Sequence, residues 1–361
     1  MGELRLMKGN EALAEAAIRA GCDGYFGYPI TPQSEVIEYL TAEKPYERTG
    51  MVVLQAESEV ASINMLYGGG ATGKKVMTSS SSPGISLMQE GISYIAGSEI
   101  PCVVVNVVRG GPGLGDIQPS QSDYFQAVKG GGHGDYRLIV LAPSSVQEMS
   151  DFVPLAFELA FKYRNPAMII SDGLIGQMME KVELFDPIPR MSNEEIKAKY
   201  PWATNGKPVG GERRIITSLD LDPARLERHN LHLQEKYRQI EENEVRVEMM
   251  DCDDADYVIV AYGSSARIAQ KSIQLAREEG IKVGLLRPVT LWPFPKKQIN
   301  KLVEKGVKGF LSVEMNAGQM VEDIKLAVSG RTQVEYFGRY GGIIPSPEEV
   351  LEALKKQIIG G

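Results

Sequence analysis

Short apolar runs that alternate with helical stretches constrain the fold of this 361-residue chain more than any other feature. Before residue 186 the runs fall at residues 24–27, 51–56, 75–78, 101–108, 138–141 and 167–171, and after residue 254 at 257–265, 283–288, 309–314 and 334–337. Runs of this kind predict strands of a parallel sheet whose two faces are covered by helices. The sequence therefore predicts an α/β protein with two doubly wound, mainly parallel sheets.

A different pattern separates the two predicted sheets. Prolines and glycines mark an irregular connection, and a highly charged helical stretch follows at residues 223–249, which we expect to be exposed to solvent. A chain of this length accommodates two domains. We predict domains at residues 1–186 and 255–361, joined by a partly helical linker at 187–254. In the first domain we also expect a helix at residues 10–21 with Asn10 as its N-cap, and a buried strand at residues 51–56.

The charge and the cysteines argue against several classes of protein. A formal net charge of -8 gives no support for binding to nucleic acid or to an anionic membrane, and no apolar stretch is long enough to span a bilayer. Cys22, Cys102 and Cys252 lack the spacing of a zinc site or an iron–sulfur cluster. We expect a cytoplasmic protein with reduced thiols and no metal ligands of its own, so that any redox metal lies on another chain.

Polar, glycine-rich or proline-rich turns follow the strands predicted in the first domain. In Tyr28-Pro29-Ile30-Thr31-Pro32 two prolines restrict the backbone around one hydroxyl group, so the segment is either a stiff loop alone or a ligand-facing turn. Later turns hold Glu59, the serines at residues 79–82 and Arg109. Because the carboxyl ends of parallel strands meet at the edge where ligands bind, we expect these side chains to converge there.

Each of these groups also has a purely structural interpretation. Glu57 and Glu59 point in different directions, so that one can face the interior, or both can be solvated at a helix N-terminus. Arg109 is either an anchor for a carboxylate or a member of an ordinary ion pair. The serines at residues 79–82 can hydrogen-bond a ligand or cap the following helix.

A glycine-rich loop at residues 110–134 lacks the glycine spacing of a dinucleotide site or a P-loop. We expect it to be a flexible active-site or interface loop. His133 within it is either a general base or a surface histidine, since no partner is visible in the sequence.

Taken together, these segments resemble the α subunit of 2-oxoacid:ferredoxin oxidoreductases. The resemblance rests on Tyr28-Pro29-Ile30-Thr31-Pro32-x-Ser34-Glu35, Glu57-Ser58-Glu59, the serine-rich residues 78–88 and Arg109-Gly110-Gly111-Pro112. In the second domain, residues 286–295 and 314–319 are similar to the transketolase C-terminal-like domain of that subunit. Residues 118–124 are most similar to the enzymes that act on branched-chain 2-oxoacids.

The resemblance implies a first domain with the fold that binds the pyrimidine of thiamine diphosphate, and a second domain with the transketolase C-terminal-like fold. It implies catalytic roles for three residues. Glu59 would hydrogen-bond N1′ of the aminopyrimidine, Thr31 would stabilise charge on the substrate oxygen, and Arg109 would anchor the substrate carboxylate. The residues expected to contact the cofactor are Tyr28, Pro29, Ile30, Thr31, Glu59, Ser81 and Ser82.

The same resemblance implies partner chains. The Gly-Asp-Gly motif that holds Mg²⁺ and the diphosphate in this family is missing, because Ser171-Asp172-Gly173 lacks the first glycine. We therefore expect thiamine diphosphate to be shared with a β subunit that holds Mg²⁺. Iron–sulfur clusters would lie on partner subunits, which include a γ subunit and a small ferredoxin-like δ subunit. CoA would be the co-substrate and an external ferredoxin the electron acceptor.

The implied reaction is the oxidative decarboxylation of a branched-chain 2-oxoacid, 2-oxoisovalerate, with CoA to acyl-CoA, CO₂ and reduced ferredoxin. Two alternatives stay open. A 2-oxoglutarate:ferredoxin oxidoreductase α subunit would need further cationic groups for the second carboxylate of its substrate. A non-catalytic scaffold subunit of a redox complex would not need Thr31, Glu59 and Arg109 together.

Overall fold

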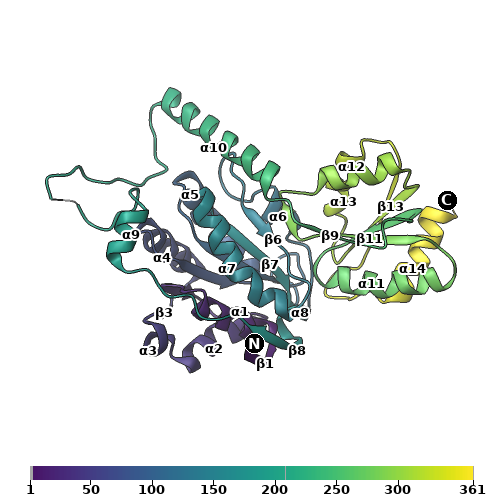
Figure 1. Cartoon of the computed structure of the whole chain (residues 1–361), viewed down its shortest axis with the longest axis horizontal. Helices are drawn as coiled ribbons and strands as arrows, with labels where there is room; N and C mark the ends of the chain where they lie inside the picture. Colours follow the sequence, from purple (N-terminus) through teal and green to yellow (C-terminus); the bar gives the residue numbers. More distant parts are fainter. Residues whose placement is uncertain (1–2, 208, 361) are drawn as a thin grey trace.

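The computed structural model describes residues 3–207 and 209–360, so Pro208 of the predicted linker and the outermost ends of both predicted domains lie outside it. Figure 1 shows a larger unit around a seven-stranded sheet and a smaller unit around a five-stranded sheet. Most pairings in both sheets are parallel. The predicted α/β class with two mainly parallel sheets is confirmed.

The larger sheet has the strand order β12-β6-β7-β5-β4-β2-β3. Its pairings are parallel except for that between β12 and β6. The strands are β2 (Gly24–Gly27), β3 (Val52–Gln55), β4 (Val76–Ser80), β5 (Val103–Val108), β6 (Ile139–Leu141), β7 (Ala167–Asp172) and β12 (Thr290–Trp292). Strands β4 and β5 are buried along their whole length, as expected for central strands covered on both faces.

Helices cover this sheet in pairs, with α1 packed against α7 and α4 against α5. In α7 the apolar residues recur at helical spacing and are buried, and the side chain of Ser145 caps the first turn by accepting a hydrogen bond from the Glu148 amide at 3.1 Å. The helices are α1 (Gly9–Arg19), α2 (Ser34–Glu43), α3 (Pro45–Thr49), α4 (Glu59–Ala71), α5 (Ser82–Gly97), α6 (Tyr124–Val128), α7 (Val146–Tyr163) and α8 (Gly173–Gln177). A separate antiparallel pair is formed by β1 (Glu3–Lys8) and β8 (Met179–Leu184).

Two local predictions for the first domain are wrong. Strand β3 is not buried but is the edge of the sheet, where Val52 and Leu54 are 45% and 42% exposed. Asn10 is not the N-cap of α1, because the helix begins one residue earlier, after Lys8. The Asn10 side chain lies inside the fold, where it donates hydrogen bonds to Pro32 and Glu35.

The chain between the two sheets contains α9 (Asn193–Lys199), α10 (Pro223–Asn243) and β9 (Val247–Met250). The prediction of a fully solvated helix is wrong for α10, because Leu233, Tyr237 and Ile240 are buried against the first domain. The charged residues on the opposite face of α10 are exposed, and these are the residues on which the prediction rests.

The smaller sheet has the order β14-β13-β10-β11-β9, with β9 antiparallel to β11. Its further strands and helices are β10 (Tyr257–Val260), α11 (Gly263–Glu278), β11 (Val283–Pro288), α12 (Lys296–Lys305), β13 (Gly309–Glu314), α13 (Met320–Val328), β14 (Gln333–Gly338), α14 (Pro347–Leu354) and the π-helical turn η1 (Lys355–Ile359). Two pairings cross the predicted domain boundaries, since β9 joins the second sheet and β12 joins the first. The division at residues 1–186, 187–254 and 255–361 stays a prediction about folding units.

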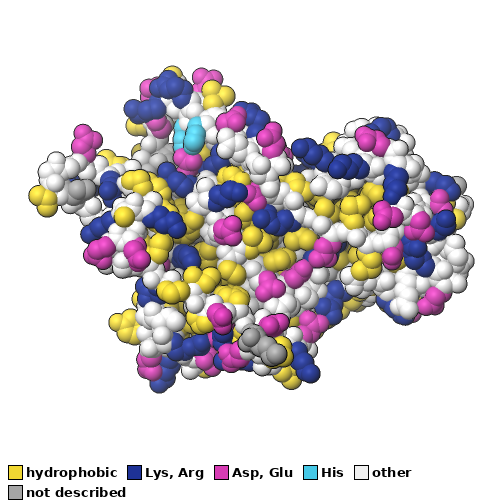
Figure 2. Space-filling view, viewed as in Figure 1, with side chains coloured by type: hydrophobic (Ala, Val, Ile, Leu, Met, Phe, Trp, Pro, Cys, Tyr) yellow, Lys and Arg dark blue, Asp and Glu magenta, His cyan; other side chains and the backbone are white. Residues whose placement is uncertain are grey.

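Surface properties follow the composition. On the face drawn in Figure 2, acidic and basic side chains are interspersed rather than gathered by sign. Within the part of the chain that the structure describes, no helix combines the length and the apolar character that a membrane crossing requires.

Candidate functional site

The turn around Thr31 connects β2 to α2 at the carboxyl edge of the larger sheet. Thr31 is exposed, whereas Gln33 behind it is fully buried. The Gln33 amide nitrogen donates to the Tyr28 carbonyl at 3.1 Å, and its amide oxygen accepts from Ser79 Oγ at 2.6 Å. The turn is therefore held from the inside by a side chain, while its threonine hydroxyl stays accessible to a ligand.

Glu59 is the first residue of α4, after Ser58, whose side chain caps the helix by accepting a hydrogen bond from the Ala61 amide. Of the two acidic residues in this turn, Glu57 is exposed and Glu59 is only 5% exposed, so one carboxylate does face the interior. Ser80 Oγ donates to Glu59 Oε1 at 3.5 Å, which is a weak hydrogen bond. Gly84 provides the space for this carboxylate, because a Cβ atom there would lie 2.5 Å from Glu59 Oε1.

Arg109 follows the last residue of β5 and is 7% exposed. Its guanidinium donates from Nη1 to the Thr31 carbonyl and from Nη2 to the Leu114 carbonyl, both at 3.0 Å. Its Nε is buried and has no hydrogen-bond partner among the described residues. Thr31 and Arg109 are thus brought together directly, and the arginine keeps a buried N–H that has no partner in the described chain.

The four serines of residues 79–82 have separate roles. Ser79 bonds to Gln33, and Ser80 bonds to Glu59. Ser81 occupies the N-cap position of α5, but its hydroxyl makes no capping bond and is buried with no partner in the described chain. Ser82 Oγ accepts from the Arg109 amide at 3.1 Å. These contacts join the turns after β2, β3, β4 and β5 at one edge, as predicted.

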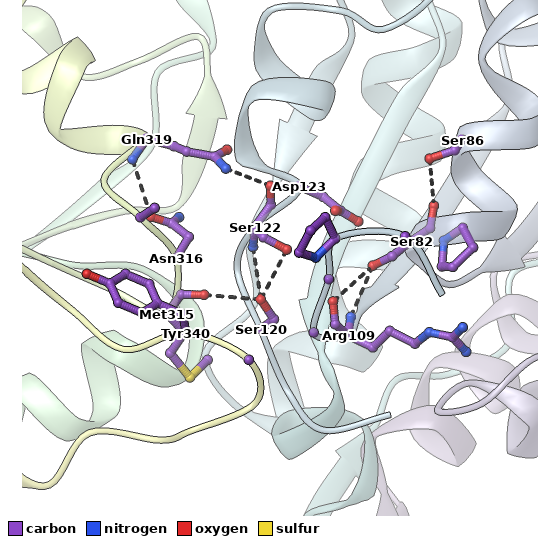
Figure 3. A pocket seen from close by; sticks show the side chains of 17 residues that line it. Ser82, Ser86, Arg109, Ser120, Ser122, Asp123, Met315, Asn316, Gln319 and Tyr340 are labelled. Atoms are coloured by element: carbon purple, nitrogen blue, oxygen red, sulfur yellow. Dashed lines mark hydrogen bonds between the residues drawn. The ribbon is translucent and has the colours of Figure 1, made fainter. Parts of the chain in front are cut away.

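A cavity of about 450 Å³ lies next to this edge, between the first and second domains (Figure 3). Ser82, Arg109 and the glycine-rich residues 110–113 line one side of it, and Met315, Asn316 and Tyr340 line the other. Figure 3 shows the Arg109 guanidinium pointing away from the second-domain residues, towards the Thr31 turn. The cavity therefore adjoins the site residues and is closed by the second domain.

Two charged side chains line this cavity, Arg109 and Asp123. Burial raises the pKa of Asp123, although hydrogen bonds from Asn106 and Ser82 oppose that shift. The ionised form of this carboxyl group disfavours a second negative charge nearby, whereas burial favours its neutral form. The described lining thus offers hydroxyl and amide groups and an apolar wall, while the guanidinium of Arg109 is directed towards the Thr31 turn.

Several residues around the cavity were not predicted from the sequence. Asp123 and Gln121 stand in the segment that carries the resemblance to branched-chain enzymes, and Asn316 and Gln319 stand in residues 314–319. In the sequence, these segments indicate only the family. A binding role is indicated only by the density of amide and hydroxyl side chains in a loop. The same density is found in solvated turns, so it does not identify a site.

His133 and Asp172 lie outside this cluster. His133 is exposed and lines a different cavity, of about 570 Å³, together with His229 of α10. Asp172 accepts hydrogen bonds from the Leu174 and Ile175 amides at the start of α8, and from Ser264 Oγ of the second domain at 2.7 Å. Burial raises the pKa of this carboxyl group.

The site combines a buried carboxylate, an exposed hydroxyl and a guanidinium whose Nε–H has no partner in the described chain. A buried carboxylate whose described partner is weak can hold or exchange a proton with a bound ring nitrogen. A hydroxyl and a guanidinium can stabilise negative charge on oxygen atoms of a substrate. These groups suit the chemistry of an oxo compound bound beside a basic heterocycle.

Comparison with known families gives two matches that follow each other along the chain. Residues 15–251 match the thiamine-diphosphate-binding domain of pyruvate flavodoxin/ferredoxin oxidoreductases. Residues 255–350 match core domain II of pyruvate:ferredoxin oxidoreductase.

Individual relatives agree with these matches. The ketoisovalerate oxidoreductase subunit VorB of Methanothermobacter thermautotrophicus is 51% identical over 98% of this chain and 97% of its own length. The 2-oxoglutarate synthase subunit KorA of Methanocaldococcus jannaschii is 38% identical over 98% of this chain and 99% of its own. Among solved structures, the 2-oxoglutarate:ferredoxin oxidoreductase of Magnetococcus marinus, with 2-oxoglutarate, coenzyme A and succinyl-CoA bound, has a TM-score of 0.85 and 29% identity. This chain is covered to 99% and spans 66% of that longer chain. A split-gene transketolase with a TM-score of 0.61 and 12% identity shares the fold.

Proposed function

We propose the function of this chain from one premise, which is that it belongs to the pyruvate flavodoxin/ferredoxin oxidoreductase family. It is the subunit of a 2-oxoacid:ferredoxin oxidoreductase that binds the pyrimidine half of thiamine diphosphate. The complex converts 2-oxoisovalerate and CoA to an acyl-CoA and CO₂ and reduces ferredoxin. A relative that is 51% identical over nearly the whole chain and is named a ketoisovalerate oxidoreductase subunit supports this substrate class.

The buried carboxylate of Glu59 is the observation that carries the proposal. Its only described side-chain partner is the distant Ser80 hydroxyl, and Gly84 leaves room beside it. These features fit a carboxylate that hydrogen-bonds N1′ of an aminopyrimidine. Thiamine diphosphate supplies, when bound, a nucleophilic carbon that attacks 2-oxo groups and stabilises the charge left by decarboxylation. Glu59 would hold the proton that the pyrimidine exchanges during that chemistry.

Thr31 and Arg109 would act on the substrate side. The exposed Thr31 hydroxyl can donate a hydrogen bond to an oxygen that gains negative charge, because its backbone is fixed by Gln33 and Arg109. Arg109 would bind the substrate carboxylate through guanidinium N–H groups that have no partner in the described chain, because only two of its five N–H groups bind main-chain carbonyls. Tyr28, Pro29, Ile30, Ser81 and Ser82 would complete the cofactor contacts.

The charges of the cavity favour 2-oxoisovalerate over 2-oxoglutarate. A second carboxylate would enter a space that contains Asp123 and whose described lining holds no cation besides Arg109, whose guanidinium is directed to the Thr31 turn. A branched apolar group meets instead Met315, Ala317 and Tyr340. The diphosphate, Mg²⁺ and the iron–sulfur clusters would lie on partner subunits, so we expect the isolated chain to bind thiamine diphosphate weakly.

Glu59→Gln in the complex with its partner subunits tests the assignment, with Glu57→Gln as the control because Glu57 is exposed in the same turn. We expect kcat with 2-oxoisovalerate to fall by about 100-fold or more for Glu59→Gln, the usual range for loss of a general acid–base group. The control should keep its activity. Unchanged turnover of Glu59→Gln at saturating thiamine diphosphate would show that the chain is a scaffold.

The substrate class is tested with the same complex. Turnover of 2-oxoisovalerate, 2-oxoglutarate and pyruvate is compared with CoA and a one-electron dye as the acceptor. A higher kcat/KM for 2-oxoglutarate than for 2-oxoisovalerate would refute the branched-chain assignment and leave the family assignment intact.

A further inference from the structure

We propose that the second domain positions Thr31 through two chains of hydrogen bonds, with Gln121 and Ser264 as the positioning residues. This inference rests on the proposed function, because it gives the second domain a task in the site that Thr31 serves. The two chains end on neighbouring main-chain carbonyl groups, those of Thr31 and Pro32.

These two carbonyl groups anchor the turn to other elements of the first domain. Arg109 Nη1 donates to the Thr31 carbonyl at 3.0 Å. Asn10 Nδ2 and Gln177 Nε2 donate to the Pro32 carbonyl at 2.7 Å and 3.2 Å. Because the Thr31 side chain is exposed, its position depends on this backbone and not on contacts of its own.

The first chain starts at Gln121, which is 2% exposed and is surrounded by the second domain. Its amide nitrogen donates to the Tyr262 carbonyl at 2.9 Å, and its amide oxygen accepts from Ser265 Oγ at 2.7 Å and from the Met315 amide at 3.0 Å. Its main chain pairs with the second domain too, because its N–H donates to the Met315 carbonyl and its carbonyl accepts from Asn316. Every polar atom of Gln121 is thus used to attach its loop to the second domain.

The loop that contains Gln121 also fixes the position of Arg109. Arg109 and Pro119 form an antiparallel bridge, in which the Gly110 amide donates to the Gln118 carbonyl at 3.0 Å. The arginine whose guanidinium holds Thr31 is therefore tied, two residues before Gln121, to a segment that the second domain fixes.

The second chain starts at Ser264, at the beginning of α11. Ser264 Oγ lies 2.7 Å from both carboxylate oxygens of Asp172, and Asp172 in turn caps α8. The last residue of α8 is Gln177, which holds the Pro32 carbonyl. At the other end of α8, a Cβ atom on Gly173 would lie 3.2 Å from Pro32 Cγ, so the helix also packs directly on the turn.

A third contact between the domains does not lead to the turn and provides the control. Asp323 of α13 accepts a hydrogen bond from Tyr124 at 2.7 Å and pairs with Lys129. Both partners lie in or beside α6, at the far end of the loop from Arg109. Asp323→Asn therefore weakens the attachment of the two domains and removes no hydrogen bond of either chain that leads to Thr31.

The first measurement is hydrogen exchange of the full chain by mass spectrometry, on the peptide that covers residues 28–35. Gln121→Ala and Ser264→Ala should each speed exchange in this peptide by at least about tenfold, whereas Asp323→Asn should leave it unchanged. Ser264→Ala removes one hydroxyl only, so its exchange rate tests the proposal if Gln121→Ala does not fold. Equal exchange in all three variants and the wild type would overturn the proposal.

The second measurement is a double-mutant cycle in the complex, with kcat and KM for 2-oxoisovalerate. We expect Gln121→Ala to lower kcat by about 10- to 100-fold, the effect of a misplaced group, and to change KM less. In a Thr31→Val background the same substitution should lower kcat by less than about twofold, because the two changes act through one group. An equal factor in both backgrounds, or the same factor for Asp323→Asn, would show a general loss of structure. If Thr31→Val itself has no effect, the proposed function fails, while the exchange measurement still tests the positioning.

Discussion

Gly84 offers a direct test of how Glu59 is placed. A Cβ atom at this position would lie 2.0 Å from Ser80 Oγ, 2.5 Å from Glu59 Oε1 and 2.9 Å from Glu59 Cγ. Heavy atoms in contact are about 3.5 Å apart, so Gly84→Ala forces the Glu59 carboxylate or the start of α5 to move by about 1 Å. A shift of that size in a catalytic group costs about 100-fold in rate. We therefore expect kcat of the complex to fall by about that factor.

The effect on stability should be small. Overpacking typically costs about 1–3 kcal/mol, while alanine in place of glycine in a helix contributes about 1 kcal/mol in the favourable direction. The net loss in free energy of unfolding, measured by urea denaturation of the isolated chain, should be about 0–2 kcal/mol.

Gly91→Ala is the matched control on the same helix. Its added Cβ would lie 2.6 Å from Ile63 Cγ2, in the packing between α4 and α5 and not at the carboxylate. We expect a similar loss of stability and a kcat within about twofold of the wild type. If Gly84→Ala keeps full turnover, or if the two variants lose turnover in proportion to stability, Gly84 does not make room for a catalytic Glu59.

Two further predictions concern charge and burial. Burial acts to raise the pKa of Glu15, but hydrogen bonds from Arg48 and Arg19 outweigh it and hold the pKa below its ordinary value. Glu15 thus stabilises the fold above its unfolded pKa, and this stabilisation is lost as the pH falls through the lower pKa of the folded state. In urea titrations, Glu15→Gln should lower the free energy of unfolding by about 3 kcal/mol at pH 7 and by progressively less below about pH 4. A cost that does not change with pH would contradict this reading. Burial raises the pKa of Cys22 to about 12 and of Cys252 to about 11, and Cys102 is buried as well. Iodoacetamide at pH 8 should therefore label none of the three thiols in the folded chain and all three in guanidinium, and rapid labelling of the folded chain would refute their burial.

The sheet edge could be predicted because it depends on a local rule. Each turn follows a strand of a parallel sheet, and adjacent strands deliver their turns to one side, so Thr31, Glu59 and Arg109 converge without knowledge of any long-range contact. The spacing of Glu57 and Glu59 leaves open whether either is buried, and the structure buries Glu59 alone.

Contacts between distant segments could not be predicted in this way. Asn10 has the sequence signature of a helix cap, and nothing local distinguishes a cap from an amide that reaches Pro32, 22 residues away. Strand β3 is as apolar as a central strand, so its position at the edge depends on pairing alone. Gln121 forms hydrogen bonds with residues of the second domain that lie about 140 and 195 positions later in the chain. Over such a separation, the spacing of residues in the sequence does not predict a contact.

The strand β12 has a consequence for how this protein can be divided. It adds to the edge strand β6 of the larger sheet, yet in the chain it lies between β11 and β13 of the smaller one. A fragment that ends before β12 would leave the main-chain groups of β6 unpaired, an exposed edge of the kind that favours aggregation. A fragment that ends after β12 would carry three of the five strands of the second sheet with it. A single crossover with a relative would therefore pair β12 with a β6 of different origin, or divide the second sheet between two origins.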